Sequence, residues 1–382
     1  MITLPSCDLA GKRIWVMAKG YAAEEGGMQT YAEGVAQGWA NAGAQVTVFT
    51  QTRLGRRMLD LGRVRLVDVG AKPAATLPLR LRLAMRREQR RHGAPDLVHG
   101  TTWRTSVVPM VLGLPFVTTF HGREFMYGGG GRLLLKRLIA RRARAICAVS
   151  KYSAARLRAR LGDECPPVVV AWNGLGPAMQ CDTAPQATDV PLIFSLCRLE
   201  PRKNIAACVA ALATLRDEGL AFRYVIAGRG PELEAIRAMV VAFRLEDRVE
   251  VAGFVPAERA AQLYAACDIF LHPQIAADDG RDFEGFGIAI ADAMAAHSAV
   301  VVGSEGGAIE LVEQGVTGLA VEGRDHAALT EAVRLLLTDR KLREKMAQAA
   351  AEHARRTFCW NAHVALIHAG CERRADGATL SG

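Results

Sequence analysis

Short apolar segments that alternate with helical patterns restrict the fold of this 382-residue chain more than any other feature. The first apolar run, residues 13–18, is followed by a glycine-containing loop, a helical pattern over residues 30–42 and a second run at residues 45–50. That order is the opening unit of a parallel sheet. Further apolar runs, separated in part by helical patterns, occur at residues 96–99, 115–120, 145–149 and 168–171. The first half therefore predicts an open α/β sheet.

The same alternation starts again after residues 177–191, which show neither a helical nor a strand period and which we interpret as a linker. Helical patterns at residues 204–218 and 231–243 lie between predicted strands at residues 192–196, 222–227, 249–252, 269–272, 299–302 and 319–321. We predict two doubly wound α/β domains, residues 1–183 and 190–357. Such sheets bind ligands at the carboxyl ends of their strands, so we expect the function to lie in a central cleft that both domains face.

Composition excludes several classes of protein. Half of the residues are hydrophobic and 23% are charged, as in globular proteins. The nine cysteines are scattered without a Cys-x-x-Cys pair, which gives no support to a zinc ribbon or a redox motif. The amino-terminal segment lacks a signal-peptide core, and no apolar stretch is long enough to span a bilayer. We therefore expect a cytoplasmic protein.

Charge is distributed unevenly between the two halves. Residues 1–183 hold 27 Lys and Arg against 12 Asp and Glu, a net charge of +15, whereas residues 184–382 carry −6. This asymmetry favours a polyanion or an anionic membrane as a partner of the first half. Nucleic acid is not expected, because no groove-reading motif is recognisable and aromatic residues are only 6%.

Two basic segments with apolar residues, 77–91 and 132–144, resemble helices that lie on anionic bilayers. In the second segment an apolar stripe is formed by Leu134 and Leu138 and, at a neighbouring angle, by Leu135 and Ile139. The alternative is an ordinary packed helix with a solvated basic face. The hypothesis is a peripheral protein on the inner face of the cell membrane.

Two glycine pairs lie between a predicted strand and a predicted helix. Gly26 and Gly27 precede the first helix, and Gly228 and Gly230 precede the helical pattern at residues 231–243. Glycine allows close backbone approach, and the amides at a helix amino terminus favour an anion. Each pair is alone also consistent with an ordinary turn.

Two cations follow the strand predicted at residues 192–196. Arg198 and Lys203, five residues apart at the carboxyl end of a strand, can clamp a diphosphate. Taken alone, two such residues are more often a solvated pair of loop charges. Asn204 is predicted to cap the following helix.

Residues 282–296 are the most informative segment. Glu284 and Asp292 are eight residues apart, and a helix that starts near Gly287 would place Glu284 just before its amino terminus. A phosphate can then bind at the helix start while the two acids accept sugar hydroxyls. The alternative is a capping Glu with a surface Asp.

Several sequence blocks, in order along nearly the whole chain, resemble the retaining glycosyltransferases of family four, in particular mannosyltransferases of the mannosyl-phosphoinositide type. The blocks are GGMQTY near residue 26, TFHGREF at 119–125, AVSKYS at 148–153, WNG at 172–174, SLCRLEPRKN at 195–204, GRGPE at 228–232, AGFVP at 252–256, EGFGIAIADAMA at 284–295, GGAIELV at 306–312 and GVTGL at 315–319. The resemblance implies the GT-B fold of two Rossmann-like domains, with the last helix, about residues 358–382, returning to the first domain.

The resemblance also implies roles for single residues. Glu284 would contact the donor sugar, and the amides of Phe286, Gly287 and Ile288 would meet the sugar and the diphosphate. Asp292 stands where the family has the Glu that holds the nucleotide ribose, so its reach is one methylene shorter.

Three further assignments follow from the same resemblance. Arg198 and Lys203 would bind the diphosphate, and Gly27 would meet the phosphates. His121 would lie near the reacting sugar, although a core histidine at a strand end is the alternative. No Asp pair lies where a metal-dependent transferase needs one, since Asp278 and Asp279 fall in a predicted loop. We therefore expect neither a metal nor a cofactor.

The predicted activity is transfer of a hexose from GDP-mannose or a UDP-sugar to a hydroxyl of a lipid-linked glycan, in cell-surface polysaccharide, lipopolysaccharide or glycolipid synthesis. Two alternatives remain at this point. One is a nucleotide-sugar epimerase of the same fold, and the other is a non-catalytic nucleotide-sugar-binding protein.

Overall fold

The computed structural model describes residues 7–21, 26–52, 56–71, 73, 76–162, 165–176 and 190–375. The chain divides into two compact units, Met1–Gly174 with Cys359–Gly382, and Leu175–Phe358. The first unit thus ends at Gly174, where the sequence placed its end at residue 183. The predicted linker lies outside the described residues except for its last two positions.

The first unit contains an eight-stranded sheet with the order β3-β4-β2-β1-β5-β6-β7-β8. All neighbouring strands are parallel except β3 and β4. The strands are β1 (Arg13–Met17), β2 (Gln45–Thr50), β3 (Arg56–Leu61), β4 (Val64–Val69), β5 (Leu97–Gly100), β6 (Phe116–Phe120), β7 (Ala145–Ala148) and β8 (Val168–Val170).

The antiparallel β3–β4 hairpin was not predicted. Edge strands keep one side in solvent, so they carry charged residues instead of a continuous apolar run. The segment RRMLDL of β3 fits that description, and its Met58 and Leu59 side chains are exposed.

Helices of the first unit surround this sheet. They are α1 (Gly27–Asn41), α2 (Leu77–His92), α3 (Val107–Val111), α4 (Arg123–Met126), α5 (Gly131–Arg142), α6 (Lys151–Leu161) and α13 (Trp360–Ala375). Helix α1 buries Tyr31, Val35 and Trp39, which are four residues apart and so share one face.

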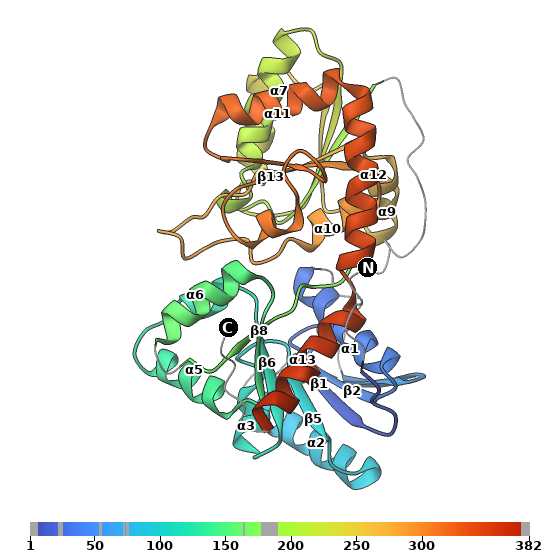
Figure 1. Ribbon diagram of the computed structural model, residues 1–382, viewed down its shortest axis with the longest axis vertical. Coiled ribbons are helices and arrows are strands. Elements are labelled where there is room, and N and C mark those ends of the chain that lie inside the picture. The colour runs from blue at the N-terminus through green and yellow to red at the C-terminus, as the bar shows by residue number, and fades with distance from the viewer. Residues whose placement is uncertain are drawn as a thin grey trace. The chain divides into compact units, whose positions relative to one another are not determined.

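The last helix, α13, packs on α1 and on strands β7 and β8 of the first unit (Figure 1). The Trp360 ring occupies the space where Gly34 and Gly174 have no side chain. A Cβ at these glycines would lie 2.0 and 2.5 Å from the ring. Gly34 therefore lets α13 approach α1 closely, and Gly174 does the same for the segment that follows β8.

The second unit contains a six-stranded parallel sheet with the order β11-β10-β9-β12-β13-β14. Its strands are β9 (Leu192–Leu196), β10 (Arg223–Ala227), β11 (Val249–Gly253), β12 (Ile269–His272), β13 (Ala299–Gly303) and β14 (Leu319–Val321). Its helices are the 3-10 turns η3 (Pro201–Lys203) and η4 (Gly307–Leu311), with α7 (Ile205–Asp217), α8 (Leu233–Ala242), α9 (Ala257–Ala266), α10 (Ile288–Ala295), α11 (His326–Thr338) and α12 (Arg340–Thr357).

The start of α10 at Ile288 confirms the predicted helix start near Gly287. The predicted cap at Asn204 is wrong. Asn204 precedes α7 with a left-handed backbone, φ 59°, and makes no side-chain capping bond. Its amide instead donates to the carbonyl oxygens of Pro273 and Gly323, which ties the start of α7 to two other loops.

Within the described part of the chain, no helix is both long and apolar enough to cross a membrane.

Candidate active site

The candidate donor site of the second unit lies where the strand order of its sheet reverses. From β9 the chain proceeds outward through β10 and β11, and it then returns to β12 on the other side of β9. Loops that leave two such neighbouring strands diverge and open a crevice at the carboxyl edge of the sheet. Lys203 follows β9 and Glu284 follows β12, so the topology brings these two predicted residues together.

The Glu284 carboxylate is clamped through one of its two oxygens. Its Oε2 accepts hydrogen bonds from Lys203 Nζ and from Arg202 Nη1, the latter at 2.8 Å, and lies 3.5 Å from His272 Nε2. Burial alone would raise the pKa of Glu284, but Lys203 and Arg202 hold it well below its usual value. The Oε1 atom makes no hydrogen bond to any residue that the structure describes. Glu284 is thus ionised, with one oxygen available as an acceptor.

The backbone around Glu284 is held by glycines. Its carbonyl oxygen accepts a hydrogen bond of 2.7 Å from the Gly307 amide. A Cβ at Gly306, whose φ is 93°, would lie 2.7 Å from the same oxygen. Phe286 is buried against Phe358, with ring centroids 5.4 Å apart. These contacts fix the segment that leads into α10.

Helix α10 begins directly after Gly287, which has a left-handed backbone with φ 94°. The first amides of a helix have no partner within it, and the helix dipole adds positive potential there. The amide of Ile288 is therefore one of those that could meet an anion close to Glu284.

The two predicted cations, Arg198 and Lys203, have different surroundings. The Arg198 side chain is 73% exposed and pairs with Glu200 at 2.9 Å. Lys203 is buried on Glu284, and the residue before it, Arg202, is equally enclosed and pairs with Glu284 and, at 3.2 Å, with Asp282. Sequence reasoning missed Arg202, because only the 3-10 turn η3 shows that consecutive residues both point inward.

His272, at the end of β12, is a second residue that sequence reasoning missed. It is buried, and its Nε2 lies 3.3 Å from Lys203 Nζ. Burial, followed by the nearby Lys203 charge, lowers the pKa of His272 to about 4. The imidazole is therefore neutral at physiological pH, and the charges of this cluster are those of Lys203, Arg202 and the acids.

Gly228 and Gly230 bring two loops into contact. A Cβ at Gly228 would lie 1.7 Å from the carbonyl oxygen of Cys197, and one at Gly230 would lie 2.1 Å from that of Leu199. Both glycines are thus required for packing of the β10 loop on the β9 loop. Between them, the Arg229 guanidinium lies over the exposed ring of Phe254 at 4.7 Å, at the carboxyl ends of β10 and β11.

The Asp292 carboxylate contacts the backbone at the start of the second unit. Its Oδ1 accepts a hydrogen bond of 2.7 Å from the Gly176 amide, and a Cβ at Gly176 would lie 2.8 Å from Oδ2. Burial raises the pKa of Asp292 to about 7, an effect that the Gly176 hydrogen bond opposes. A surface Asp, the alternative considered from the sequence, does not describe this position.

In the first unit the strand order reverses between β1 and β5. Gly26 and Gly27 follow β1 at the start of α1, where a Cβ at Gly27 would meet nothing within 4 Å. His121 follows β6 and donates from Nε2 to the Thr101 carbonyl at 2.8 Å. Burial lowers the pKa of His121, so the ring is neutral and its Nδ1 carries a lone pair.

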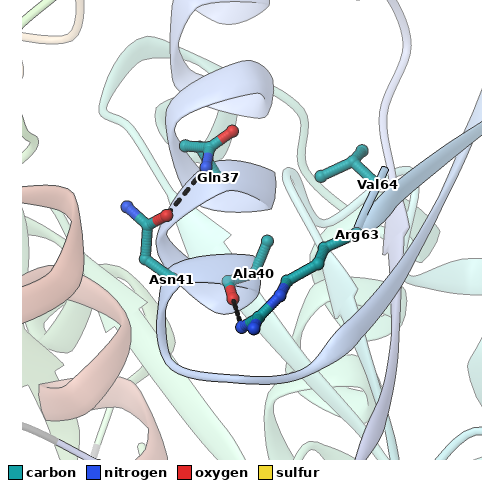
Figure 2. Close-up of a pocket in the computed structure, with 5 residues that line it drawn as sticks. All are labelled: Gln37, Ala40, Asn41, Arg63 and Val64. Atoms are coloured by element: carbon teal, nitrogen blue, oxygen red, sulfur yellow. Dashed lines mark hydrogen bonds between the residues drawn. The ribbon is translucent and has the colours of Figure 1, made fainter. Parts of the chain in front are cut away.

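A separate surface pocket lies at the opposite edge of the first sheet. Figure 2 shows its lining residues, Gln37, Ala40 and Asn41 from the end of α1 with Arg63 and Val64 at the start of β4. Because β4 begins there, the pocket lies at the amino ends of the strands, away from Gly27 and His121. We do not assign it to the reaction.

Among the described residues, no cluster of His, Cys, Asp and Glu could hold a metal ion. Asp278 and Asp279 lie in a loop with positive φ, and Asp278 pairs with Arg281 at 2.6 Å.

Two family models match most of the chain. Glycosyltransferase Family 4 matches residues 25–178, and Glycosyl transferases group 1 matches residues 183–353. The chain belongs to the group 1 glycosyltransferases of family four. Its two parallel-sheet units form the GT-B fold, as the sequence predicts.

Individual relatives add detail. A GDP-mannose-dependent alpha-(1-6)-phosphatidylinositol monomannoside mannosyltransferase of Mycolicibacterium smegmatis is 28% identical over 90% of this chain and 94% of its own. The amylovoran biosynthesis glycosyltransferase AmsK of Erwinia amylovora is 37% identical over 37% of this chain and 35% of its own. Several other curated relatives are matched over only about half of their length.

Among solved structures, Anabaena HepE in complex with UDP and glucose has a TM-score of 0.72 and 20% identity, over 93% of this chain and 99% of that one. At this identity the likeness concerns the fold.

Proposed function

We propose that the protein is a retaining glycosyltransferase that moves a hexose from a nucleoside diphosphate sugar to a hydroxyl of a lipid-linked glycan. The observation that carries the proposal is the Glu284 cluster. An ionised carboxylate has one oxygen fixed by Lys203 and Arg202, and among the described residues the other oxygen has no hydrogen-bond partner. The carboxylate lies next to the amino terminus of α10. A carboxylate of this kind accepts sugar hydroxyls, and the adjoining positive groups suit phosphates.

The reaction requires stabilisation of the departing nucleoside diphosphate. In this proposal Lys203, Arg198, the α10 amides and the glycine amides at the start of α1 supply positive potential, a form of electrostatic catalysis that needs no metal ion. Retention of configuration would follow from attack on the same face within an ion pair, with the leaving phosphate accepting the acceptor proton. His121, which the family resemblance places near the reacting sugar, offers Nδ1 as a hydrogen-bond acceptor.

For the donor we propose GDP-mannose, since a relative that is matched over 90% of this chain is GDP-mannose-dependent. A UDP-sugar is the second candidate, because HepE has been solved with UDP and glucose. The Arg229–Phe254 pair, at the carboxyl ends of β10 and β11, offers a flat surface for the base of either nucleotide.

A thermal-shift screen with GDP, UDP and their common sugars, in EDTA, is expected to show stabilisation by GDP and GDP-mannose. A ligand at 100 times its Kd stabilises by about 2.7 kcal/mol, which such a screen resolves. Transfer to extracted lipid-linked glycan should then proceed in EDTA at an unchanged rate.

Two results would contradict this scheme. Turnover that EDTA abolishes and Mg²⁺ restores would make the reaction metal-dependent. Conversion of the donor to an epimer without acceptor would replace the transferase by an epimerase.

For the acceptor side we propose contact with an anionic membrane through α5. The predicted apolar stripe of this helix is partly buried and partly exposed. Ile139 lies in the core, whereas the side chains of Leu134 and Leu138 are 68% and 36% exposed. Arg141 and Arg142 on the same helix are also exposed, and the neighbouring helix α3 exposes Val111. Apolar side chains next to exposed arginines suit the headgroup region of an anionic bilayer.

Vesicles rich in phosphatidylglycerol are expected to carry the protein upward in flotation at low salt, and much less protein in 0.5 M NaCl. The double variant Leu134→Glu, Leu138→Glu should lower the bound fraction at least tenfold, because it adds two negative charges and removes the apolar contacts. Leu335→Glu, at a leucine of α11 that is about as exposed as Leu138, is the control and should float like the unmodified protein. Equal flotation of the two variants would contradict a role for α5.

A further inference from the structure

A chain of buried hydrogen bonds connects α1, the central strands of the first sheet and the last helix. It begins at Trp39, whose Nε1 donates to His99 Nδ1 at 3.1 Å. Because the indole nitrogen can only donate, His99 carries its proton on Nε2 and donates it to Thr119 Oγ1 at 2.9 Å. All three residues are buried.

The contacts of His363, at the other end of this hydrogen-bond network, show which atom of each remaining pair donates. His363 on α13 contacts the Trp172 carbonyl through Nδ1 at 2.9 Å, and a carbonyl only accepts, so Nδ1 is the protonated nitrogen. His363 Nε2 must then accept from the Tyr31 hydroxyl, at 3.0 Å. Tyr31 in turn accepts from Thr119, at 2.7 Å. The hydroxyl of Tyr31 is therefore held from two sides.

Both histidines of this hydrogen-bond network, His99 and His363, are neutral, and the arrangement of donors and acceptors depends on that. Burial lowers the pKa of His99 well below its usual value and that of His363 to about 4. A proton added to Nδ1 of His99 would face the Trp39 N–H, which can only donate.

Tyr31 connects the network to His121. The two rings meet edge to face, with centroids 4.4 Å apart and an interplanar angle of 89°. Together with the bond from His121 Nε2 to Thr101, this contact sets both the plane of the His121 ring and its tautomer. Within the network, Tyr31 is the residue whose ring contacts the His121 ring.

We propose that His363 is a positioning residue for His121 and acts through Tyr31, so that the last helix of the chain completes the site of the first unit. Removing the acceptor at His363 Nε2 would free the Tyr31 hydroxyl, and the Tyr31 ring would no longer hold the His121 imidazole in one plane and one tautomer. The consequence for turnover rests on the proposed function, whereas the consequence for the imidazole does not.

The test compares His363→Phe, which cannot accept a hydrogen bond, with His363→Gln, whose amide can both accept from Tyr31 and donate to Trp172. We expect His363→Phe to lower kcat about tenfold or more at unchanged donor KM, since misplacement by about 1 Å can cost up to about 100-fold. His363→Gln should recover most of the loss, and Tyr31→Phe should behave like His363→Phe. The matched control is His368→Phe, at a partly exposed position of α13.

A second readout does not depend on turnover. In ¹⁵N-histidine-labelled protein, His121 should show a single Nε2–H tautomer, and His363→Phe should convert it to a mixture while His368→Phe does not. An unchanged His121 signal in folded His363→Phe would overturn the proposal, whether or not the protein transfers sugar. Equal losses of kcat and of melting temperature in His363→Phe and His363→Gln would also overturn it, because they indicate a purely structural histidine.

Discussion

Replacing Glu284 by alanine is expected to reduce transfer to background and to destabilise the protein by about 3–5 kcal/mol, the usual cost of removing one partner of a buried ion pair. Glu284 neutralises both Lys203 and Arg202, and all three side chains are at most 15% exposed. Without the carboxylate, two enclosed cations lie next to each other and the acceptor for the donor sugar is lost. Steady-state transfer assays and thermal unfolding measure the two effects.

The two effects can be separated by a second substitution. In the Glu284→Ala background Arg202 keeps its pairs with Glu200 and Asp282, whereas Lys203 loses its acidic partner. Lys203→Met removes that cation, so it should restore part of the stability and none of the activity. Glu284→Gln keeps the volume but not the charge, and it should lose at least 100-fold in kcat/KM with a smaller loss of stability. Glu218→Ala, at an exposed acid paired with Arg334, is the control and should leave both quantities near their original values. A Glu284→Ala protein with normal turnover would refute the site assignment.

Most strands were predictable from the sequence because they lie inside parallel sheets. Parallel strands are covered on both faces, so they appear in the sequence as continuous apolar runs, and the bounds of β2, β9, β12 and β14 agree with the prediction. The hairpin of β3 and β4 was not predicted, because β3 is an edge strand that contains charged residues. The start of α10 was predictable because Gly287 is the kind of residue that a left-handed helix entry requires.

The site was predictable in part. Glu284 stands out in the sequence because an acid precedes a glycine-rich helix start. The sequence does not show which cations reach it, since Arg198, Arg202 and Lys203 lie within six residues and differ only in the direction that η3 gives them. His272 is equally hidden, because a histidine at the end of a buried strand has no local pattern. Its role depends on a contact with Lys203, 69 residues away in sequence.

Asp292 has one contact assigned by the family resemblance and another in the structure. The resemblance assigns it to the nucleotide ribose, and the structure places one of its oxygens on the Gly176 amide. The two roles are compatible, because Oδ2 makes no hydrogen bond to any residue within the described ranges. A carboxylate that serves both would be a strong acceptor only when ionised, which links donor binding to its raised pKa.

Asp292→Asn is expected to stabilise the protein at pH 8 and to have almost no effect near pH 4. The pKa of Asp292 is raised from 3.8 to about 7 in the folded protein, so the folded state binds its proton more tightly than the unfolded state does. The stability due to that proton is fully present below about pH 4 and is lost as the pH rises to about 7, up to about 4 kcal/mol in total. Asparagine does not titrate, and its side-chain oxygen can still accept from Gly176, so the variant escapes this loss.

Donor binding should become stronger as the pH rises, whereas the stability of the unmodified protein falls. Ionisation of Asp292 improves it as an acceptor for the ribose hydroxyls, so the donor KM of the unmodified protein should fall as the pH rises through about 7. The Asn variant should lack this step and have the weaker binding at pH 8. Thermal unfolding and donor KM, each measured from pH 5 to 8, test both parts, with Asp247→Asn as an exposed control. A stability difference that does not change with pH would refute the raised pKa. A parallel KM profile in both proteins would remove Asp292 from the ribose site and leave it only its contact with Gly176.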